Sequence, residues 1–350
     1  MTDMSFLRER INEVDRKIVE LMADRLEIAR QIGQYKMDNG IPIRDVGREE
    51  HVFQKYRDNA EDLGISPDVA EAVCRILVKD SVDEQAANTP NTSGSKVIGI
   101  IGGKGRMGRW LDILLRGDGH RTIIVDKDTE STIEDCRDAD IVIISTPIPT
   151  IKGIYAELDA ICSEHTVLTD LASIKSSFYK DLKEMSQHRK VCSMHPMFAS
   201  SDRSMYDRNL IMCDCGNSEA LDTVRSIFDN KGANIITMEV EKHDRYMAYV
   251  LGMSHAINIA FFDSLVKSGF TYKELNSIAS TTFRKSLDAN KSVAFDDPVL
   301  YHDIQYLNEN SKEIWDIFYS CVTELKDASL KEDRGDFVDI MSKGREYFSE

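Results

Sequence analysis

The chain has 350 residues, of which 42% are hydrophobic and 30% charged, an ordinary composition for a protein of two or three folded domains. A net charge of −16 argues against a nucleic-acid or membrane-surface partner, and no run approaches the roughly 18 apolar residues of a membrane span. The N-terminus lacks the apolar core of a signal peptide, and the seven scattered cysteines read as free thiols rather than metal ligands, so we expect a cytoplasmic protein without a metal site.

The first predicted element is a long helix over residues 4–39. Apolar residues recur along it in alternating steps of four and three, the pattern of a helix that packs against other helices. The segment contains no proline, and "DNG" at 38–40 ends it with a glycine in the usual C-terminal place. Such a helix is roughly 50 Å long. Because a small domain cannot bury that length, we expect a partner chain to cover it.

Position 25 of this apolar seam holds an arginine. By itself, Arg25 is either a cation at the helix edge whose charged end reaches water, or a cation that binds a ligand. Lys36 lies 11 residues further on. On an ideal helix it projects within about 20° of Arg25, so the two cations share one face.

The next two predicted helices run from the end of "IPIRD" to about residue 63, and from the N-cap Ser66 to about residue 87. Each carries polar side chains on one face at helical spacing: Asp45, Arg48 and Glu49 on the first, Ser81 and Gln85 on the second. Taken singly, each set is an ordinary solvated helix face. Taken together, three helices offer polar groups to a common interior, where unpaired cations are very unfavourable. An anionic ligand with hydroxyl groups would satisfy them.

Residues 5–87 resemble the all-helical chorismate mutase family through "LRERINEVDRKIVELMADRLEIARQIGQYK", "RDVGREE" and "KDSVDEQ". The resemblance implies an intertwined dimer of three-helix chains. It also implies that four cations hold the two carboxylates of chorismate: Arg8, Arg25, Lys36 and Arg48. In that family the first arginine serves the partner chain's site, and Arg8 does project about 100° away from Arg25 on an ideal helix.

The same resemblance assigns the remaining polar residues. Asp45, Glu49 and Ser81 would contact the hydroxyl and carboxylate groups of the substrate, while Lys36 and Gln85 would donate to its ether oxygen. The conversion of chorismate to prephenate is a pericyclic rearrangement that needs no nucleophile, so the site would act by holding the substrate folded and stabilising charge on the ether oxygen. The alternative is that these helices form a sensor of aromatic ligands and a dimerisation module without catalysis.

After this first domain, residues 1–88, the polar stretch "NTPNTSGS" at 88–95 predicts a linker, which we place at 89–95. Short β-branched runs then alternate with helical stretches: "KVIGIIGG", "TIIVD", "ADIVIIS", "TVLTDLA" and "KVCSMHP". This alternation predicts an α/β domain over 96–241, with a parallel sheet covered on both faces. From 242 to 350 only helical periodicity remains, which predicts an all-α C-terminal domain.

A Gly-x-Gly-x-x-Gly pattern lies in "VIGIIGGKGRMGRWL", where it follows a β-branched strand and opens a helix. Asp126 ends the next strand, 23 residues after the first of these glycines. This context is the dinucleotide-binding (Rossmann) fingerprint, in which the pyrophosphate sits at a helix N-terminus. We expect the loop to bind the cofactor through Gly103, Gly105, Arg106, Met107 and Gly108. The carboxylate of Asp126 would accept hydrogen bonds from the ribose and repel a 2′-phosphate, which favours NAD over NADP.

Other polar residues follow the ends of predicted strands. Ser145, Thr146 and Pro147 end a strand that we count as the fourth of this domain, while Ser173 and His195 end two later strands. Because the carboxyl ends of parallel strands share one edge of the sheet, we expect these residues near the cofactor. A histidine in that position is more often catalytic than structural.

Residues 96–350 resemble prephenate dehydrogenase through "GGKGRMGR", "DLASIK", "HPMF", "EKHDRYMAY" and "DDPVLYHDI", so the whole chain resembles the fused, bifunctional chorismate mutase–prephenate dehydrogenases of tyrosine biosynthesis. The resemblance implies oxidative decarboxylation of prephenate to 4-hydroxyphenylpyruvate with NAD, by a homodimer. His195 would accept a hydrogen bond from the ring hydroxyl and Ser173 would orient it. His255 would contact the substrate from the helical domain, across the cleft.

One position departs from that family. An arginine that binds a substrate carboxylate normally precedes "FDDP", and here Ser292 stands in its place. Lys291 is adjacent, and Arg284 lies two helical turns earlier, where its reach is poorer unless the helix breaks near Asn290. We expect Lys291 to make the contact, because its flexible side chain can bend back or the stretch is a loop. The altered anion site is the reason to keep an arogenate dehydrogenase as the alternative to a prephenate dehydrogenase.

Overall fold

The computed structural model describes residues 3–87, 94–202 and 204–349, so most of the predicted linker lies outside the described residues. The chain divides into two compact units. The first contains Met1–Thr146, Gly153–Leu171 and Leu182–Met238, and the second contains Pro147–Lys152, Ala172–Asp181 and Glu239–Glu350. Along the sequence we distinguish a three-helix segment (3–87), a sheet segment (94–239) and a helical segment (240–349).

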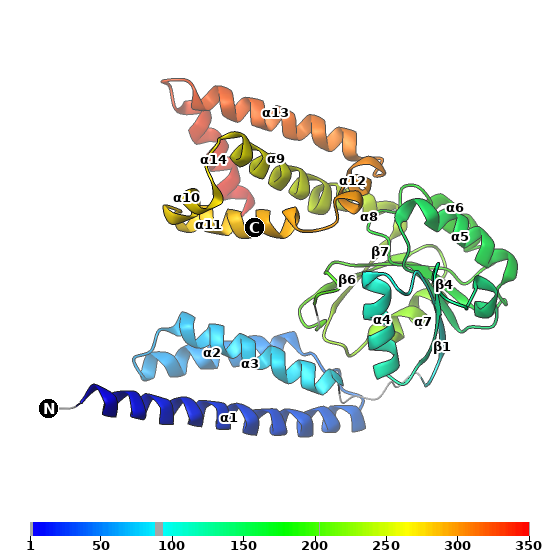
Figure 1. Ribbon diagram of the computed structural model, residues 1–350, viewed down its shortest axis with the longest axis horizontal. Helices are drawn as coiled ribbons and strands as arrows, with labels where there is room; N and C mark the ends of the chain where they lie inside the picture. Colours follow the sequence, from blue (N-terminus) through cyan, green and yellow to red (C-terminus); the bar gives the residue numbers. More distant parts are fainter. Residues whose placement is uncertain (1–2, 88–93, 203, 350) are drawn as a thin grey trace. The chain divides into compact units, whose positions relative to one another are not determined.

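The three-helix segment has the helices that the sequence predicts. They are α1 (Met4–Asp38), α2 (Val46–Asp62) and α3 (Pro67–Ala87), with α3 packed against both of the others (Figure 1). Side chains cap the first two, since Asp3 accepts a hydrogen bond from the Ser5 amide and Asp45 accepts one from the Arg48 amide. The apolar cluster of this segment is small: Ile43, Phe53, Cys74, Val78 and Val82.

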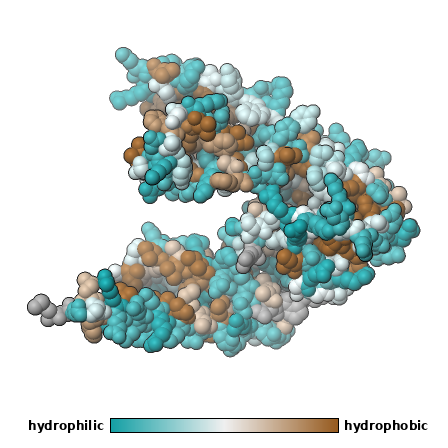
Figure 2. Space-filling model, viewed as in Figure 1, coloured by the Kyte–Doolittle hydropathy of each residue, from teal (hydrophilic) through white to brown (hydrophobic). Residues whose placement is uncertain are grey.

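The apolar seam of α1 is exposed in the single chain, as expected for a helix that packs against a partner chain. The exposed fraction is 62% for Ile11, 51% for Ile18 and 56% for Ile28. Figure 2 shows that apolar side chains also lie on the surface of the three-helix segment as a whole. Only Ala29 and Gly33 of α1 are buried, so the single chain covers little of this helix.

All five predicted strands of the sheet segment are present. A parallel sheet has the order β2-β1-β3-β4, and both faces of β3 and β4 are buried. The strands are β1 (Val97–Ile101), β2 (Arg121–Val125), β3 (Ile141–Ile144), β4 (Val167–Asp170) and β5 (Ser193–Pro196). Around them lie α4 (Arg106–Gly117), η1 (Ile133–Cys136), α5 (Ile148–Ile161), α6 (Tyr179–Met185) and α7 (Ser218–Phe228).

Two features of the sheet segment differ from the sequence prediction. The strands β6 (Asn209–Asp214) and β7 (Asn234–Glu239) were not predicted. They form a second sheet with the order β5-β6-β7, in which β6 pairs with β5 in antiparallel fashion, so the segment does not contain a single parallel sheet. A short apolar run such as "LIMC" fits a buried strand or a buried helix equally well, and only pairing with β5 decides. The strand before Ser145 is β3, the third along the chain and not the fourth. An isolated parallel bridge joins Leu168 of β4 to Val191, two residues before β5 begins.

The helical segment begins at Val240, directly after β7. Its elements are α8 (Val240–Met247), the π-helical turn η2 (Ala248–Met253), α9 (Ser254–Lys267), α10 (Tyr272–Ser277), α11 (Thr281–Ala294), α12 (Pro298–Tyr306), α13 (Ser311–Ser329) and α14 (Gly335–Tyr347). Within the described residues it contains no strand, as predicted.

One helical run, Val240–Lys267, is long and apolar enough to cross a membrane by length and composition. The expectation that no run of the sequence approaches a membrane span is therefore wrong for the length and composition of this run. Only 17% of its most apolar window is buried within the chain. A helix that a second copy of the chain covers has the same composition, so the run is weak evidence for a membrane span.

Candidate active sites

The arginine in the seam of α1 points at α3. The half-buried Arg25 donates through Nη1 to the main-chain oxygen of Leu77 and to the hydroxyl of Ser81. The buried Ser81 in turn donates to the Leu77 oxygen at 2.9 Å. The structure thus brings together two of the predicted site residues, which lie on different helices and are 56 positions apart in the sequence.

Gln85 lies one helical turn further along α3 and against α1. A Cβ atom on the buried Gly33 would be 3.0 Å from the Gln85 side chain, so a glycine there lets the two helices approach closely. Gln85 is itself 6% exposed.

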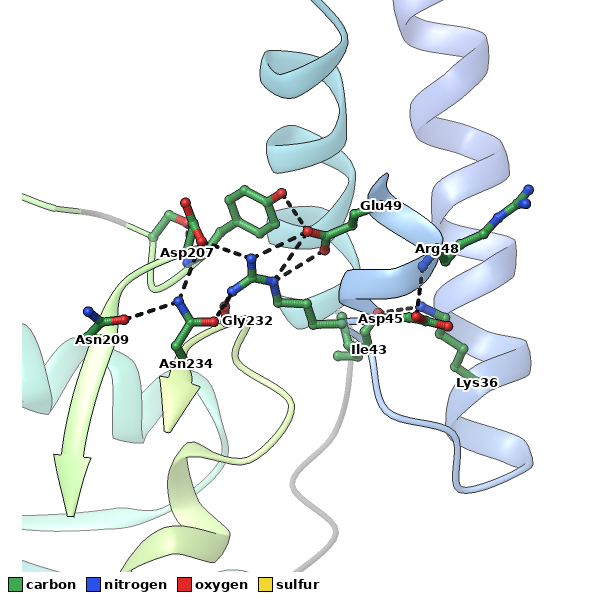
Figure 3. A network of polar contacts seen from close by, with 12 residues as sticks. Lys36, Ile43, Asp45, Arg48, Glu49, Asp207, Asn209, Gly232 and Asn234 are labelled. Carbon is green, nitrogen blue, oxygen red and sulfur yellow. Dashed lines mark hydrogen bonds and ion pairs between the residues drawn. The ribbon is translucent and has the colours of Figure 1, made fainter. Parts of the chain in front are cut away.

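Lys36 is half-buried near the start of α2. Its ammonium group donates to the main-chain oxygen of Ile43, and burial lowers its pKa although Asp45 and Glu49 oppose that shift. Asp45 uses a carboxylate oxygen to cap α2, accepting from the Arg48 amide at 2.9 Å. The side chain of Arg48 is exposed and extends away from Glu49 (Figure 3). Asp45 and Arg48 therefore line the open side of this region, and Glu49 the buried side.

Glu49 is 8% exposed and contacts two residues that the sequence analysis did not select. Arg44 lies 3.3 Å from its carboxylate, and the hydroxyl of Tyr206 donates to the same group at 3.0 Å. Arg44 could have been suspected as a cation immediately before α2. Tyr206 belongs to the sheet segment, and no local signal indicates its role.

Arg8 is not near the other cations in this chain. It is exposed on α1, 17 residues before Arg25, or about 25 Å along the helix axis. A single chain therefore cannot use both arginines in one site. A second copy lying along α1 could supply the other one.

In the sheet segment, the glycine loop lies between β1 and α4. Gly102 has a φ of +82° and donates from its amide to the Val125 main-chain oxygen at 2.8 Å. A Cβ on Gly108 would fall 2.4 Å from the oxygen of Gly102, so only glycine fits there. The close packing places the N-terminus of α4 directly at the loop, the arrangement that accepts a phosphate group.

Asp126 follows β2 and contacts this loop. Its Oδ2 accepts from the Lys104 amide at 2.9 Å, and its Oδ1 accepts from the Lys127 amide at 2.8 Å. The carboxylate is thus fixed beside the glycine turn, with lone pairs left for a ribose hydroxyl. The remaining loop residues Gly103, Gly105, Arg106 and Met107 lie in the same turn and the first turn of α4.

The ends of the next strands hold the other predicted residues. Ser145 follows β3 and donates from its amide to the Ile101 oxygen at 2.7 Å, and a Cβ on Gly102 would meet the Ser145 oxygen at 2.5 Å. Ser145 and Thr146 therefore lie beside the glycine loop, with Pro147 next in the chain. His195 is 4% exposed on β5, opposite Ile211 of β6.

Ser173 lies in a loop that begins after β4 and belongs to the second compact unit. Within that unit, the carboxylate of Asp244 accepts from the amides of Lys175 and Ser176 at 2.9 and 2.5 Å, and His243 contacts it at 2.6 Å. Burial acts to raise the pKa of Asp244, but the contacts from His243 and Ser176 outweigh it and lower that pKa. His243 and Asp244 lie in the motif "EKHDRYMAY", but the sequence alone does not predict that this pair holds the Ser173 loop.

His255 follows the π-helical turn and stacks on Tyr301, with ring centroids 4.0 Å apart. Burial lowers its pKa, and within the described residues its Nδ1 has no hydrogen-bond partner. The neutral ring therefore keeps one polar atom for a ligand.

The region around Ser292 is a continuous helix. Because α11 runs from Thr281 to Ala294, the possibility of a loop at 291 or a break near Asn290 is wrong. Ser292 donates to the Ala289 oxygen, and Lys291 and Arg284 are both exposed. On an ideal helix Lys291 lies about 40° from the buried Leu287, closer to the packed face than Ser292.

No cluster of three or more histidine, cysteine or acidic side chains suited to a metal ion occurs among the described residues. All seven cysteines are free, and Cys213 and Cys215 are buried.

Comparison with family models divides the chain as the fold does. Residues 7–86 match chorismate mutase type II, residues 116–237 match the nucleotide-binding domain of prephenate dehydrogenase, and residues 239–343 match its dimerization domain. The glycine loop precedes the second match, so its assignment depends on the geometry above.

Two curated relatives extend over the whole chain. The T-protein of Enterobacter agglomerans is 27% identical over 360 residues, covering 100% of this chain and 94% of the relative. The T-protein of Haemophilus influenzae is 28% identical over 354 residues, covering 100% and 93%.

Solved structures resemble part of the chain. Prephenate dehydrogenase from A. aeolicus, in complex with hydroxyphenyl propionate and NAD+, has a TM-score of 0.59 and 22% identity over 73% of this chain and 98% of its own. Synechocystis arogenate dehydrogenase has a TM-score of 0.54 and 18% identity over 72% and 99%. At these identities the likeness concerns the fold.

Proposed function

The chain belongs to the family in which a chorismate mutase is fused to a prephenate dehydrogenase, and from this premise we propose how its two sites work. It is a bifunctional enzyme of tyrosine biosynthesis that rearranges chorismate to prephenate and oxidatively decarboxylates prephenate to 4-hydroxyphenylpyruvate. The observation that carries this conclusion is the order of three family matches along one chain, with relatives of the same organisation over its full length.

In the mutase reaction, Arg25 and Lys36 are the cations that hold the substrate carboxylates, together with Arg48. Arg25 donates a hydrogen bond to the hydroxyl of Ser81, and Lys36 donates one to a main-chain oxygen. These bonds orient both cations before the substrate binds. Lys36 and Gln85 donate to the ether oxygen as its charge develops, and Asp45, Glu49 and Ser81 contact the remaining polar groups. Preorganised donors of this kind stabilise a polar transition state without any proton transfer.

We propose a cytoplasmic homodimer in which Arg8 of one copy completes the mutase site of the other. The exposed apolar seam of α1 supports this, since burying it stabilises an assembly by roughly 25 cal/mol for each Å² removed from water. The match to a dimerization domain and the exposed apolar run Val240–Lys267 support a second contact between copies.

For the dehydrogenase reaction the cofactor is NAD. The glycine cradle, which a Cβ at Gly102 or Gly108 would fill, fits a pyrophosphate, and the fixed carboxylate of Asp126 fits a ribose without a 2′-phosphate. NAD supplies the acceptor for the hydride that leaves prephenate. The loop residues bind it, with Ser145, Thr146 and Pro147 at the neighbouring strand end.

The protein's own side chains then act on prephenate. His195 accepts the hydrogen bond of the ring hydroxyl and stabilises positive charge as hydride leaves that carbon, while Ser173 orients His195. Loss of CO2 restores the aromatic ring, so no base is required at carbon. His255 and Lys291 are proposed to bind the substrate, with Arg284 as the other candidate for the carboxylate.

The test is a coupled assay with chorismate, with and without NAD. Chorismate should disappear without NAD, which excludes a sensor role for the three helices, and NADH should form only when NAD is added. A comparison of prephenate with arogenate as substrate distinguishes the two dehydrogenase activities; a clear preference for arogenate would overturn the prephenate assignment.

A further inference from the structure

A polar network joins the three-helix segment to the sheet segment within the first compact unit. At its centre is Arg44, whose side chain is 13% exposed. Its guanidinium group lies 3.3 Å from Glu49 and 2.9 Å from Asp207, and also donates to Asn234 and to the main-chain oxygen of Gly232 (Figure 3). One arginine of the mutase region is therefore held by three residues of the dehydrogenase region.

Tyr206 makes the second link. Its ring packs against the apolar cluster of the three-helix segment and lies 4.8 Å from the guanidinium carbon of Arg44. Its hydroxyl donates to Glu49 at 3.0 Å. Burial, followed by the negative charge of Glu49, raises the pKa of this hydroxyl, so the group stays a proton donor throughout the neutral range.

Glu49 depends on these two partners. Among the residues that the structure describes, only Arg44 and Tyr206 hydrogen-bond to its buried carboxylate. A buried carboxylate is very unfavourable without such partners, and their directions fix where it points. The three-helix segment alone would supply only Arg44, and that arginine itself takes its position from the sheet segment.

We propose that Tyr206, a residue of the dehydrogenase region, is a positioning residue for the mutase reaction that acts through Glu49, with Arg44 as the bridge. This inference rests on the proposed contact of Glu49 with chorismate. It gives the fusion of the two enzymes a physical role, because one region completes the active site of the other.

Other contacts hold the two segments together besides the bond from the Tyr206 hydroxyl. The Ser204 hydroxyl donates to Asp83, and the Ile43 amide donates to Asn230 at 3.3 Å. A Cβ on Gly232 would meet Val82 of α3 at 3.2 Å, which shows how closely the segments approach. Removing only the hydroxyl leaves these contacts and the ring packing in place, so its loss tests positioning and not docking.

The experiment compares Tyr206→Phe with Tyr56→Phe in the full chain. Tyr56 packs against the same apolar cluster, and its hydroxyl has no hydrogen bond among the described residues, so it is a matched control. Tyr206→Phe should lower kcat/KM for chorismate about tenfold, mainly through a higher KM, because a hydrogen bond to a charged group is lost at a binding residue. Prephenate oxidation and the Tyr56→Phe variant should match the wild type.

A further readout separates positioning from a structural effect. In a Glu49→Gln background, Tyr206→Phe should have little additional effect on the mutase, because both changes remove the same interaction.

The outcomes are distinguishable. If Glu49→Gln leaves the mutase unchanged, the proposed role of Glu49 fails. If Glu49→Gln impairs it and Tyr206→Phe does not, or if Tyr56→Phe impairs it equally, the positioning role of Tyr206 is overturned while Glu49 keeps its role.

Discussion

The three-helix segment and the sheet segment hold their proposed site residues in different ways. β3 and β4 are buried on both faces, and the glycine loop, Asp126 and Ser145 are all fixed by neighbours within the same fold. The three-helix segment has only a small apolar cluster, leaves the seam of α1 exposed, and holds Glu49 with a tyrosine from elsewhere. The cofactor loop is therefore held by contacts within its own segment, whereas Glu49 of the three-helix segment is held in part by a residue from outside its segment.

The largest expected effect separates the two sites directly. Arg25→Ala should lower mutase activity about 30- to 1000-fold, because a charge-assisted contact to a bound dianion contributes roughly 2–4 kcal/mol. Prephenate oxidation by the same variant should stay near the wild-type rate. Steady-state rates with each substrate measure this, and equal loss of both activities in a folded variant would refute two separate sites.

The reciprocal change is His195→Asn in the sheet segment. Turnover of prephenate should fall 10²-fold or more, the usual scale for a general acid–base partner, while the mutase rate is unchanged. The affinity for NAD, measured by fluorescence titration, should hardly change because the imidazole is expected to face the substrate. Unchanged turnover would remove His195 from the mechanism.

The dependence of the three helices on a second copy is tested at Ile18, which is 51% exposed on α1. Ile18→Glu places a charge in the proposed contact between copies, so mutase activity should fall at least about tenfold while NAD binding persists. Asn12→Glu, on a polar face of the same helix, is the control. Should both variants behave alike in activity and in sedimentation, the seam does not pair.

A smaller effect concerns the carboxylate contact that Ser292 cannot make. Lys291→Ala should raise the KM for prephenate about tenfold and leave that for NAD unchanged. Arg284→Ala, on the same exposed helix, is the matched comparison. If only the Arg284 variant shows the defect, that residue makes the contact, and if neither does, the carboxylate is bound elsewhere.

The smallest effect is on acid stability. The folded-state pKa of Asp244 is lower than its unfolded value, so its contribution to stability is present above an ordinary aspartate pKa of about 3.9 and is lost as pH falls through the lower folded value. Thermal melts of the wild type should therefore drop in this range. Asp244→Asn should melt a few degrees lower at neutral pH, by roughly the loss of one charged hydrogen bond, and show a weaker drop in acid. An identical acid dependence in both proteins would exclude Asp244 as its source.

Local patterns in the sequence determined much of this protein. The period of the apolar residues predicted α1, α2 and α3 to within about two residues, and the glycine spacing with Asp126 predicted the cofactor loop. Arg25 stood out because it interrupts an apolar seam. Each of these signals lies within one helix or one strand–turn–helix unit, where neighbours in sequence are neighbours in space.

Tertiary structure alone decided the rest. β6 is defined by its pairing with β5, the Ser173 loop is held by Asp244 some 69 positions away, and Glu49 meets Tyr206 across 157 positions. Periodicity reports which face of an element is apolar, but it carries no information about which distant polar group will meet that face. Such partners are selected by packing and by the need to satisfy buried charge, and both exist only once the chain has folded.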